Sequence, residues 1–268
     1  TWTVPGAAGT GASLTYDVAT PAAAVGVKSF SGTARSGSSD FATGGNWEVT
    51  VVPPKSNGLG IFTQSEDIFS SETVAGDAGY DPNTGTYVVI GTGNDIWGAE
   101  DNFHFLYIEV SGKVSLKANC QLFVGGGDTE DTKIGPMVRD EIDPSSSHGL
   151  SLIRSWGRDF GPQWRDSFAG ESGEDQNLNV PGGTVEGRQN GTIEITRDGT
   201  AIGFYYYDAA TGKRVETLVH EVAEMTDPIY VGLAVTSHNT GNYSTGVFTN
   251  VVLTVNDKPV PVVDWALY

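Results

Sequence analysis

A strictly alternating segment, Val114–Val124, constrains most strongly how this chain can fold. Successive side chains of a β-strand point to opposite faces of a sheet, so a period of two predicts an antiparallel strand with one buried face. Cys120 falls on the apolar side, where a buried, unreactive thiol is the simplest interpretation. The apolar positions are Val114, Leu116, Ala118, Cys120, Leu122 and Val124, and the polar ones are Ser115, Lys117, Asn119 and Gln121.

After residue 60, short strand-like runs alternate with turn residues. Thr86–Ile90 and Phe103–Val110 flank a polar corner at Gly91–Asn102, which predicts two strands joined by a loop. Turn residues at 197–199 and 208–212 predict hairpins, whereas Leu218–Met225 predicts one or two helical turns. The other predicted strands are Thr132–Arg139, His148–Ser155, Gly161–Phe168, Thr192–Arg197, Ala201–Asp208, Ile229–Thr236 and Thr245–Val255.

Composition excludes several classes of protein. Against 15 basic residues stand 33 acidic ones, so the net charge is -18 and we expect no nucleic-acid partner. A single cysteine excludes an intramolecular disulfide, and no apolar run is long enough to predict a membrane span. Charged residues make up only 18% of the chain and glycines number 36, which favours turn-rich β-structure over helix.

Residues 1–60 are rich in Gly, Ala, Ser and Thr and predict an arm with isolated strand-like patches. Patches this short do not fold alone, so the arm pairs either with its own domain or with a neighbouring subunit. We therefore divide the chain into an arm at 1–60, a β-sandwich at 61–256, and an edge strand or tail at 257–268. The patches are Trp2–Val4, Ser13–Val18, Val25–Phe30 and Trp47–Val52.

Three segments, Gly91–Tyr107, Lys133–Ile153 and Ile229–Leu253, resemble a known group of proteins. They read GTGNDIWGAEDNFHFLY, KIGPMVRDEIDPSSSHGLSLI and IYVGLAVTSHNTGNYSTGVFTNVVL, and are similar in sequence and order to secreted bacterial modules of the concanavalin A-like lectin/glucanase superfamily, of the regulation-of-enolase type. The resemblance covers roughly residues 62–256. It implies an all-β, two-sheet antiparallel jelly roll and a secreted or cell-surface location, but it leaves the function open.

The polar corner holds four candidate metal ligands, Asn94, Asp95, Glu100 and Asp101. Clustered oxygen ligands are what calcium requires, so a structural calcium ion is one interpretation. The other, which we favour, is that these side chains cap turns by bonding their own backbone. A second acidic cluster, at 140–143, is interpreted as a solvated loop.

Catalytic patterns are weak. Glucanases of the superfamily carry their carboxylates at alternating positions of one strand, and this chain has no such pattern, which argues against a retaining hydrolase. A polysaccharide lyase needs a Tyr or His base and a cation, which His148, Arg139, Arg165 and the tyrosines 205–207 supply by type. An enzyme is therefore the less favoured class.

Aromatic side chains provide the remaining signal. A sugar-binding platform predicts glycan contacts at Trp156, Trp164, Arg165 and His148. In a sandwich, alternate aromatic residues usually lie in the core, and for Trp164 we favour that interpretation.

Three functional hypotheses follow, in order of preference. The first is an extracellular structural protein that polymerises into a filament by strand addition, with Leu14, Tyr16 and Val18 of the arm as anchors in a neighbouring copy. The second is a lectin-like module for a neutral or cationic glycan, because an acidic surface disfavours polyanions. The third is a polysaccharide-degrading enzyme.

Overall fold

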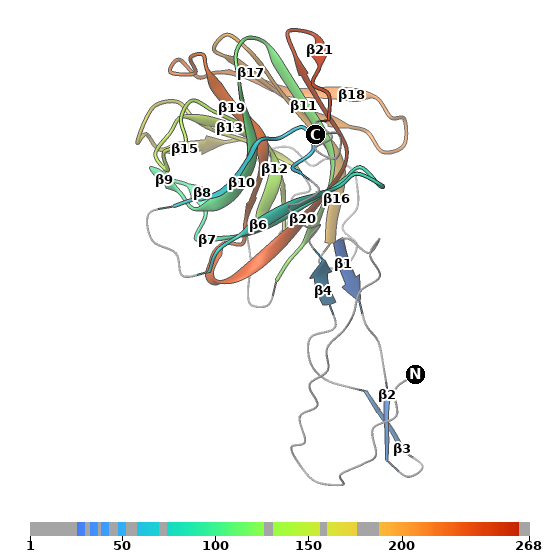
Figure 1. Ribbon diagram of the computed structural model, residues 1–268. Helices are drawn as coiled ribbons and strands as arrows, with labels where there is room; N and C mark the ends of the chain where they lie inside the picture. Colours follow the sequence, from blue (N-terminus) through green and yellow to red (C-terminus); the bar gives the residue numbers. More distant parts are fainter. Residues whose placement is uncertain are drawn as a thin grey trace. The chain divides into compact units, whose positions relative to one another are not determined.

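The computed structural model describes residues 26–29, 33–36, 39–42, 48–51, 58–69, 74–125, 131–155, 160–175 and 188–262. The chain divides into two compact units, Thr1–Val51 and Val52–Tyr268. In the first unit β1 (Gly26–Ser29) pairs with β4 (Glu48–Val51), and β2 (Thr33–Ser36) pairs with β3 (Ser39–Ala42), all antiparallel (Figure 1). Strands β1 and β4 lie within two of the predicted patches. The anchors Leu14, Tyr16 and Val18 lie outside the described residues.

The second unit is an all-β sandwich of two large antiparallel sheets, as the sequence predicts. No helix among its described residues is long and apolar enough to cross a membrane. The seven-stranded sheet runs in the order β15 (Ser172–Glu174), β14 (Gly161–Arg165), β13 (His148–Arg154), β12 (Lys133–Arg139), β19 (Ile229–Thr236), β10 (Phe103–Val110), β5 (Gln64–Ile68). The eight-stranded sheet runs β18 (Arg214–Glu221), β17 (Ala201–Tyr207), β16 (Arg188–Asp198), β11 (Val114–Phe123), β20 (Asn239–Val255), β7 (Thr86–Gly93), β6 (Asp77–Asp81), and β21 (Lys258–Pro259) pairs with β20.

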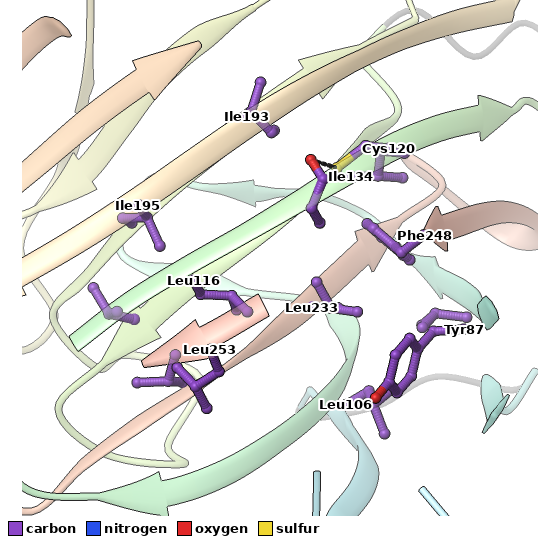
Figure 2. Packing of buried hydrophobic residues seen from close by; sticks show 14 of the residues in the cluster. Tyr87, Leu106, Leu116, Cys120, Ile134, Ile193, Ile195, Leu233, Phe248 and Leu253 are labelled. Carbon is purple, nitrogen blue, oxygen red and sulfur yellow. Dashed lines mark hydrogen bonds between the residues drawn. The ribbon is translucent and has the colours of Figure 1, made fainter. Parts of the chain in front are cut away.

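The alternation of Val114–Val124 produces the predicted strand β11 at the centre of the eight-stranded sheet. From Val114 to Leu122 its side chains are alternately buried and half-buried, and the buried set packs between the two sheets. Figure 2 shows Leu116 and Ile195 of one sheet in the same cluster as Leu233 of the other. Cys120 is fully buried there, as the sequence predicts, and desolvation raises the pKa of its thiol.

A second apolar cluster covers the outer face of the seven-stranded sheet, the face turned away from the eight-stranded sheet. Phe105 and Tyr107 of β10 stack there at 4.9 Å between ring centroids, and Met137, Leu150 and Ala234 of neighbouring strands complete the layer. The middle of this sheet is therefore apolar on both faces. This explains the continuous burial of Phe103–Tyr107 in β10 and of all of β12.

The predicted helical segment Leu218–Met225 is wrong. Residues up to Glu221 belong to β18, the edge strand that pairs with β17. The register shifts between Phe204 and Tyr205, so Thr217 is an extra residue in β18, and its hydroxyl donates to the Phe204 carbonyl at 2.8 Å. Such a bulge breaks the period of two, which removes the strand signal from the sequence.

Candidate functional site

The polar corner between β7 and β10 forms a small hairpin that lies on the outer face of the seven-stranded sheet. Its strands are β8 (Ile96–Trp97) and β9 (Glu100–Asp101), and Ile96 inserts into the second apolar cluster. The Ile96 carbonyl accepts hydrogen bonds from Gln163 at 2.6 Å and Lys133 at 3.1 Å, and the Gly98 carbonyl accepts from Arg165 at 2.9 Å. The hairpin is thus bound to the sheet through its backbone.

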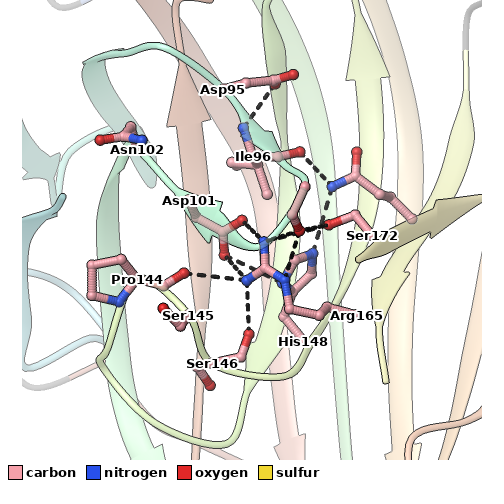
Figure 3. A network of polar contacts seen from close by, with 12 residues as sticks. Asp95, Ile96, Asp101, Asn102, Pro144, Ser145, Ser146, His148, Arg165 and Ser172 are labelled. Carbon is pink, nitrogen blue, oxygen red and sulfur yellow. Dashed lines mark hydrogen bonds and ion pairs between the residues drawn. The ribbon is translucent and has the colours of Figure 1, made fainter. Parts of the chain in front are cut away.

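Asp101 of β9 lies at the centre of a fully buried ionic cluster (Figure 3). Its carboxylate accepts hydrogen bonds from Arg139 at 2.6 Å and from Arg165 at 2.5 and 2.9 Å, and His148 Nδ1 lies 3.3 Å away. Burial alone would raise the pKa of Asp101, but His148 and the two guanidinium groups lower it well below the usual range. The carboxylate is therefore ionised in the folded protein.

The two arginines of this cluster carry more positive charge than Asp101 neutralises. Their remaining N–H groups donate to backbone carbonyls, Arg139 to Asp143 at 2.6 Å and Arg165 to Ser146 at 3.0 Å. The carbonyl groups of the loop after β12 thus stabilise the excess positive charge. One network of hydrogen bonds therefore connects this loop, the hairpin and the sheet.

The buried cluster contains three of the predicted lyase residues, His148, Arg139 and Arg165, each of which is 0% exposed. Burial lowers the pKa of His148, whose Nδ1 lies 3.3 Å from Asp101 and whose Nε2 lies 3.5 Å from the amide nitrogen of Gln163. Tyr205 and Tyr207 lie on the eight-stranded sheet, where their hydroxyls donate to carboxylates of that sheet. A substrate could contact His148 only after displacement of the hairpin.

The four predicted calcium ligands are not brought together. Asp95 accepts from Lys133 Nζ at 2.7 Å, Asp101 is held by the arginines, and Asn94 and Glu100 are exposed. Over the described ranges, no three acidic, His or Cys side chains are grouped as metal ligands. Calcium at these residues stays a prediction.

The predicted glycan contacts are likewise separated. Trp164 packs against the main core, and its ring stacks on His220 at 4.2 Å. His148 and Arg165 are fully buried on the opposite face of the same sheet, and Trp156 lies outside the described residues. The core interpretation of Trp164 agrees with this packing, and glycan contact by these residues stays a prediction.

A pocket of about 460 Å³ opens among three loops, those between β12 and β13, β14 and β15, and β18 and β19. We call it the acidic pocket, because three of its residues are carboxylic acids and none of the described residues that line it is basic. Phe168 at its rim is 54% exposed. The lining residues are Asp140, Glu141, Ser146, Ser147, Phe168, Ala223, Glu224 and Thr226.

The three carboxylates of the acidic pocket differ in how they are bound. Asp140 Oδ1 accepts from the amide of Thr226 at 2.7 Å, and Glu224 Oε2 accepts from the amide of Phe168 at 2.6 Å, so both fix the loops to one another. The exposed carboxylate of Glu141 forms no hydrogen bond or ion pair within the described part of the chain. It is available to a ligand.

Only one of the three loops that form this pocket stands out in the sequence. It carries the acidic cluster at 140–143, for which a solvated loop is the favoured interpretation. Glu224 and Phe168 come from loops distant in sequence, and only the pairing of their strands brings them to Asp140. No local pattern could have indicated that contact.

No family model and no curated protein sequence matches this chain. Similar solved structures include a functionally unknown protein from Saccharomyces cerevisiae, with 14% identity, 67% of this chain and 96% of that chain covered, and a TM-score of 0.49. They also include an alginate lyase from Klebsiella pneumoniae, with 10% identity, 67% and 84% coverage and a TM-score of 0.41. A lectin from Bauhinia forficata in complex with GalNAc has 10% identity, 72% and 98% coverage and a TM-score of 0.38. The fold assignment rests on the chain's own sheets, and membership of the regulation-of-enolase group stays a prediction.

Proposed function

We propose that this chain is an extracellular or cell-surface carbohydrate-binding module without catalytic activity, and that its glycan lies in the acidic pocket. The observation that carries this proposal is the combination of an exposed aromatic ring, Phe168, with an unengaged carboxylate, Glu141, in one pocket. Its volume of about 460 Å³ falls within the range usual for small-ligand sites.

The chemistry of the pocket suits a sugar. Carboxylate oxygens accept hydrogen bonds from neighbouring hydroxyl groups, and charged acceptors form stronger bonds than neutral ones. The ring of Phe168 offers an apolar surface to the C–H face of a pyranose. The pocket is formed by loops on a rigid sandwich, which is where binding residues concentrate in many folds.

The burial of the predicted lyase residues supports a binding role over a lyase. His148, the base that a lyase would need, is 0% exposed beneath the hairpin, and the two nearest guanidinium groups are bound to Asp101. A lyase also needs an anionic substrate, which a chain of net charge -18 repels.

Calorimetric titration with neutral and amino oligosaccharides tests the proposal. Phe168→Ala should weaken binding by about tenfold or more, because it removes the stacking surface. The matched control is Tyr243→Ala, which removes another exposed aromatic side chain, 51% accessible. Failure of the unmodified chain to bind any glycan would overturn the proposal, as would equal affinity of both variants.

The second candidate function is self-assembly into a filament through the N-terminal unit. It is favoured by the presence of two separate two-stranded sheets in that unit, since such small sheets are marginally stable alone and gain from further pairing. Light scattering of the full chain, before and after removal of residues 1–20, tests it. Polymers that disappear with those residues support strand exchange through Leu14, Tyr16 and Val18, whereas a monomer in both states excludes it.

A further inference from the structure

The acidic pocket carries more negative charge than the binding of a neutral sugar requires. Asp140, Glu141 and Glu224 converge on it, and no described lining residue offers a compensating positive charge. The guanidinium groups of Arg139 and Arg165, which bond the loop between β12 and β13, are fully buried and are held by Asp101 and by backbone carbonyls. A cationic group in the pocket would therefore meet attraction from several sides.

The dimensions of the pocket favour an organic cation over a bare metal ion. A calcium ion needs six to eight oxygen atoms at about 2.4 Å, which requires a compact cage. The pocket volume is about 460 Å³, and no three of the described carboxylate, His or Cys side chains are grouped closely enough to hold a metal. A pocket of this volume suits an ammonium group that is attached to a larger organic molecule.

Ser147 provides a second, independent observation that points to a ligand site. It lines the pocket and is 2% exposed, yet its Oγ has no hydrogen-bond partner among the described residues. A buried hydroxyl without a partner is costly, so such groups usually mark the position of a ligand or an ordered water. A hydroxyl oxygen is an acceptor that an ammonium group can use alongside carboxylates.

We infer that the acidic pocket binds the free ammonium group of an amino sugar, with Glu141 and Glu224 as the charged acceptors, Ser147 as a neutral acceptor and Phe168 stacked on the sugar ring. This inference rests on the proposed carbohydrate-binding function and narrows it to glycans with unacetylated amines. An acetylated amine carries no charge, so the pocket discriminates between the two forms.

The test compares two tetrasaccharides of the same linkage, one of glucosamine and one of N-acetylglucosamine, titrated into the full chain near neutral pH. The glucosamine form should bind about tenfold or more tightly, because hydrogen bonds to charged groups exceed neutral ones by that order. The preference should shrink with added salt. Glu141→Gln should remove most of the preference while leaving the affinity for the acetylated form nearly unchanged.

Two further variants separate the pocket from the general acidity of the chain. Asp257→Asn removes a carboxylate that is 82% exposed at the turn between β20 and β21, and it should leave the preference intact. Ser147→Ala should weaken binding of the glucosamine form without lowering stability, since its hydroxyl bonds to nothing described in the free protein. An equal loss of preference in Asp257→Asn would overturn the pocket as its source.

The outcomes also distinguish this inference from the function beneath it. Equal binding of both tetrasaccharides, or binding of other neutral glycans alone, overturns the ammonium inference and leaves the carbohydrate-binding proposal standing. Absence of binding to every glycan overturns both. A lysine-rich peptide that binds as tightly as the glucosamine form would overturn the assignment to a sugar.

Discussion

Asp101 is the residue on which the outer face of the seven-stranded sheet depends most. A single carboxylate, 0% exposed, holds two guanidinium groups that belong to different strands. The pairing need not be stabilising relative to an apolar core, because burial of each ion is costly. Removal of one partner is a different matter, since it leaves the others charged and uncompensated.

Asp101→Asn should therefore lower the free energy of unfolding by about 3–5 kcal/mol, although aspartate and asparagine side chains are nearly the same size. Urea denaturation followed by tryptophan fluorescence measures the change. The matched control is Glu100→Gln, the exposed neighbour in the same strand, for which we expect less than about 0.5 kcal/mol. Equal effects of the two substitutions would contradict the account of the cluster.

At the scale of elements, the hairpin of β8 and β9 takes the place of a second layer over the outer face. Ile96 is 0% exposed within the second apolar cluster, whereas its neighbour Trp97 is 39% exposed. The hairpin therefore contributes to stability through one inserted side chain and through its backbone bonds to Gln163 and Lys133.

Ile96→Ala should reduce the free energy of unfolding by about 2–5 kcal/mol, the range for a fully buried aliphatic side chain. Trp97→Ala should cost less, although it removes more atoms, because much of that ring is in solvent. Denaturation midpoints of the two variants decide between them. An unchanged midpoint for Ile96→Ala would mean that the hairpin unfolds independently of the sandwich.

Prediction from sequence succeeded where one element carries its own pattern. Strand β11 alternates from Val114 to Leu122, and the predicted strand Val114–Val124 matches its ends to within one residue. The prediction of one or two helical turns at Leu218–Met225 fails over the last four residues of β18, because the bulge at Thr217 disrupts the period of two. The acidic pocket was missed because Asp140, Phe168 and Glu224 belong to three loops that meet only through the strand order, which no local signal encodes.

For the whole molecule, four groups with shifted pKa values make stability depend on pH. The pKa values of Asp101 and Glu194 are lowered, although burial alone would raise them. For Asp101, His148 and the two arginines outweigh burial. For Glu194, hydrogen bonds outweigh burial, and the bond from Arg214 has the largest effect. Their contribution is complete above the pKa of the unfolded chain, near 4, and is lost as pH falls. Burial lowers the pKa of His148, so its protonation favours unfolding below about pH 6.5.

At alkaline pH, stability is lost as the pH rises rather than as it falls. Burial, and then the bond to Glu194, raise the pKa of Tyr207 to about 12, so this contribution is complete below pH 10 and is lost between about 10 and 12. We expect melting temperatures to fall on both sides of a plateau. Asp101→Asn should flatten the acidic side, and an unchanged acidic slope in that variant would contradict the assignment.

The position of Cys120 has a practical consequence. The chain has one cysteine in 268 residues, and its side chain is 0% exposed between the two sheets. A thiol reagent can reach it only when the sheets separate, and no second thiol confuses the signal. The rate of labelling therefore reports how often the sandwich opens spontaneously under native conditions, without any denaturant.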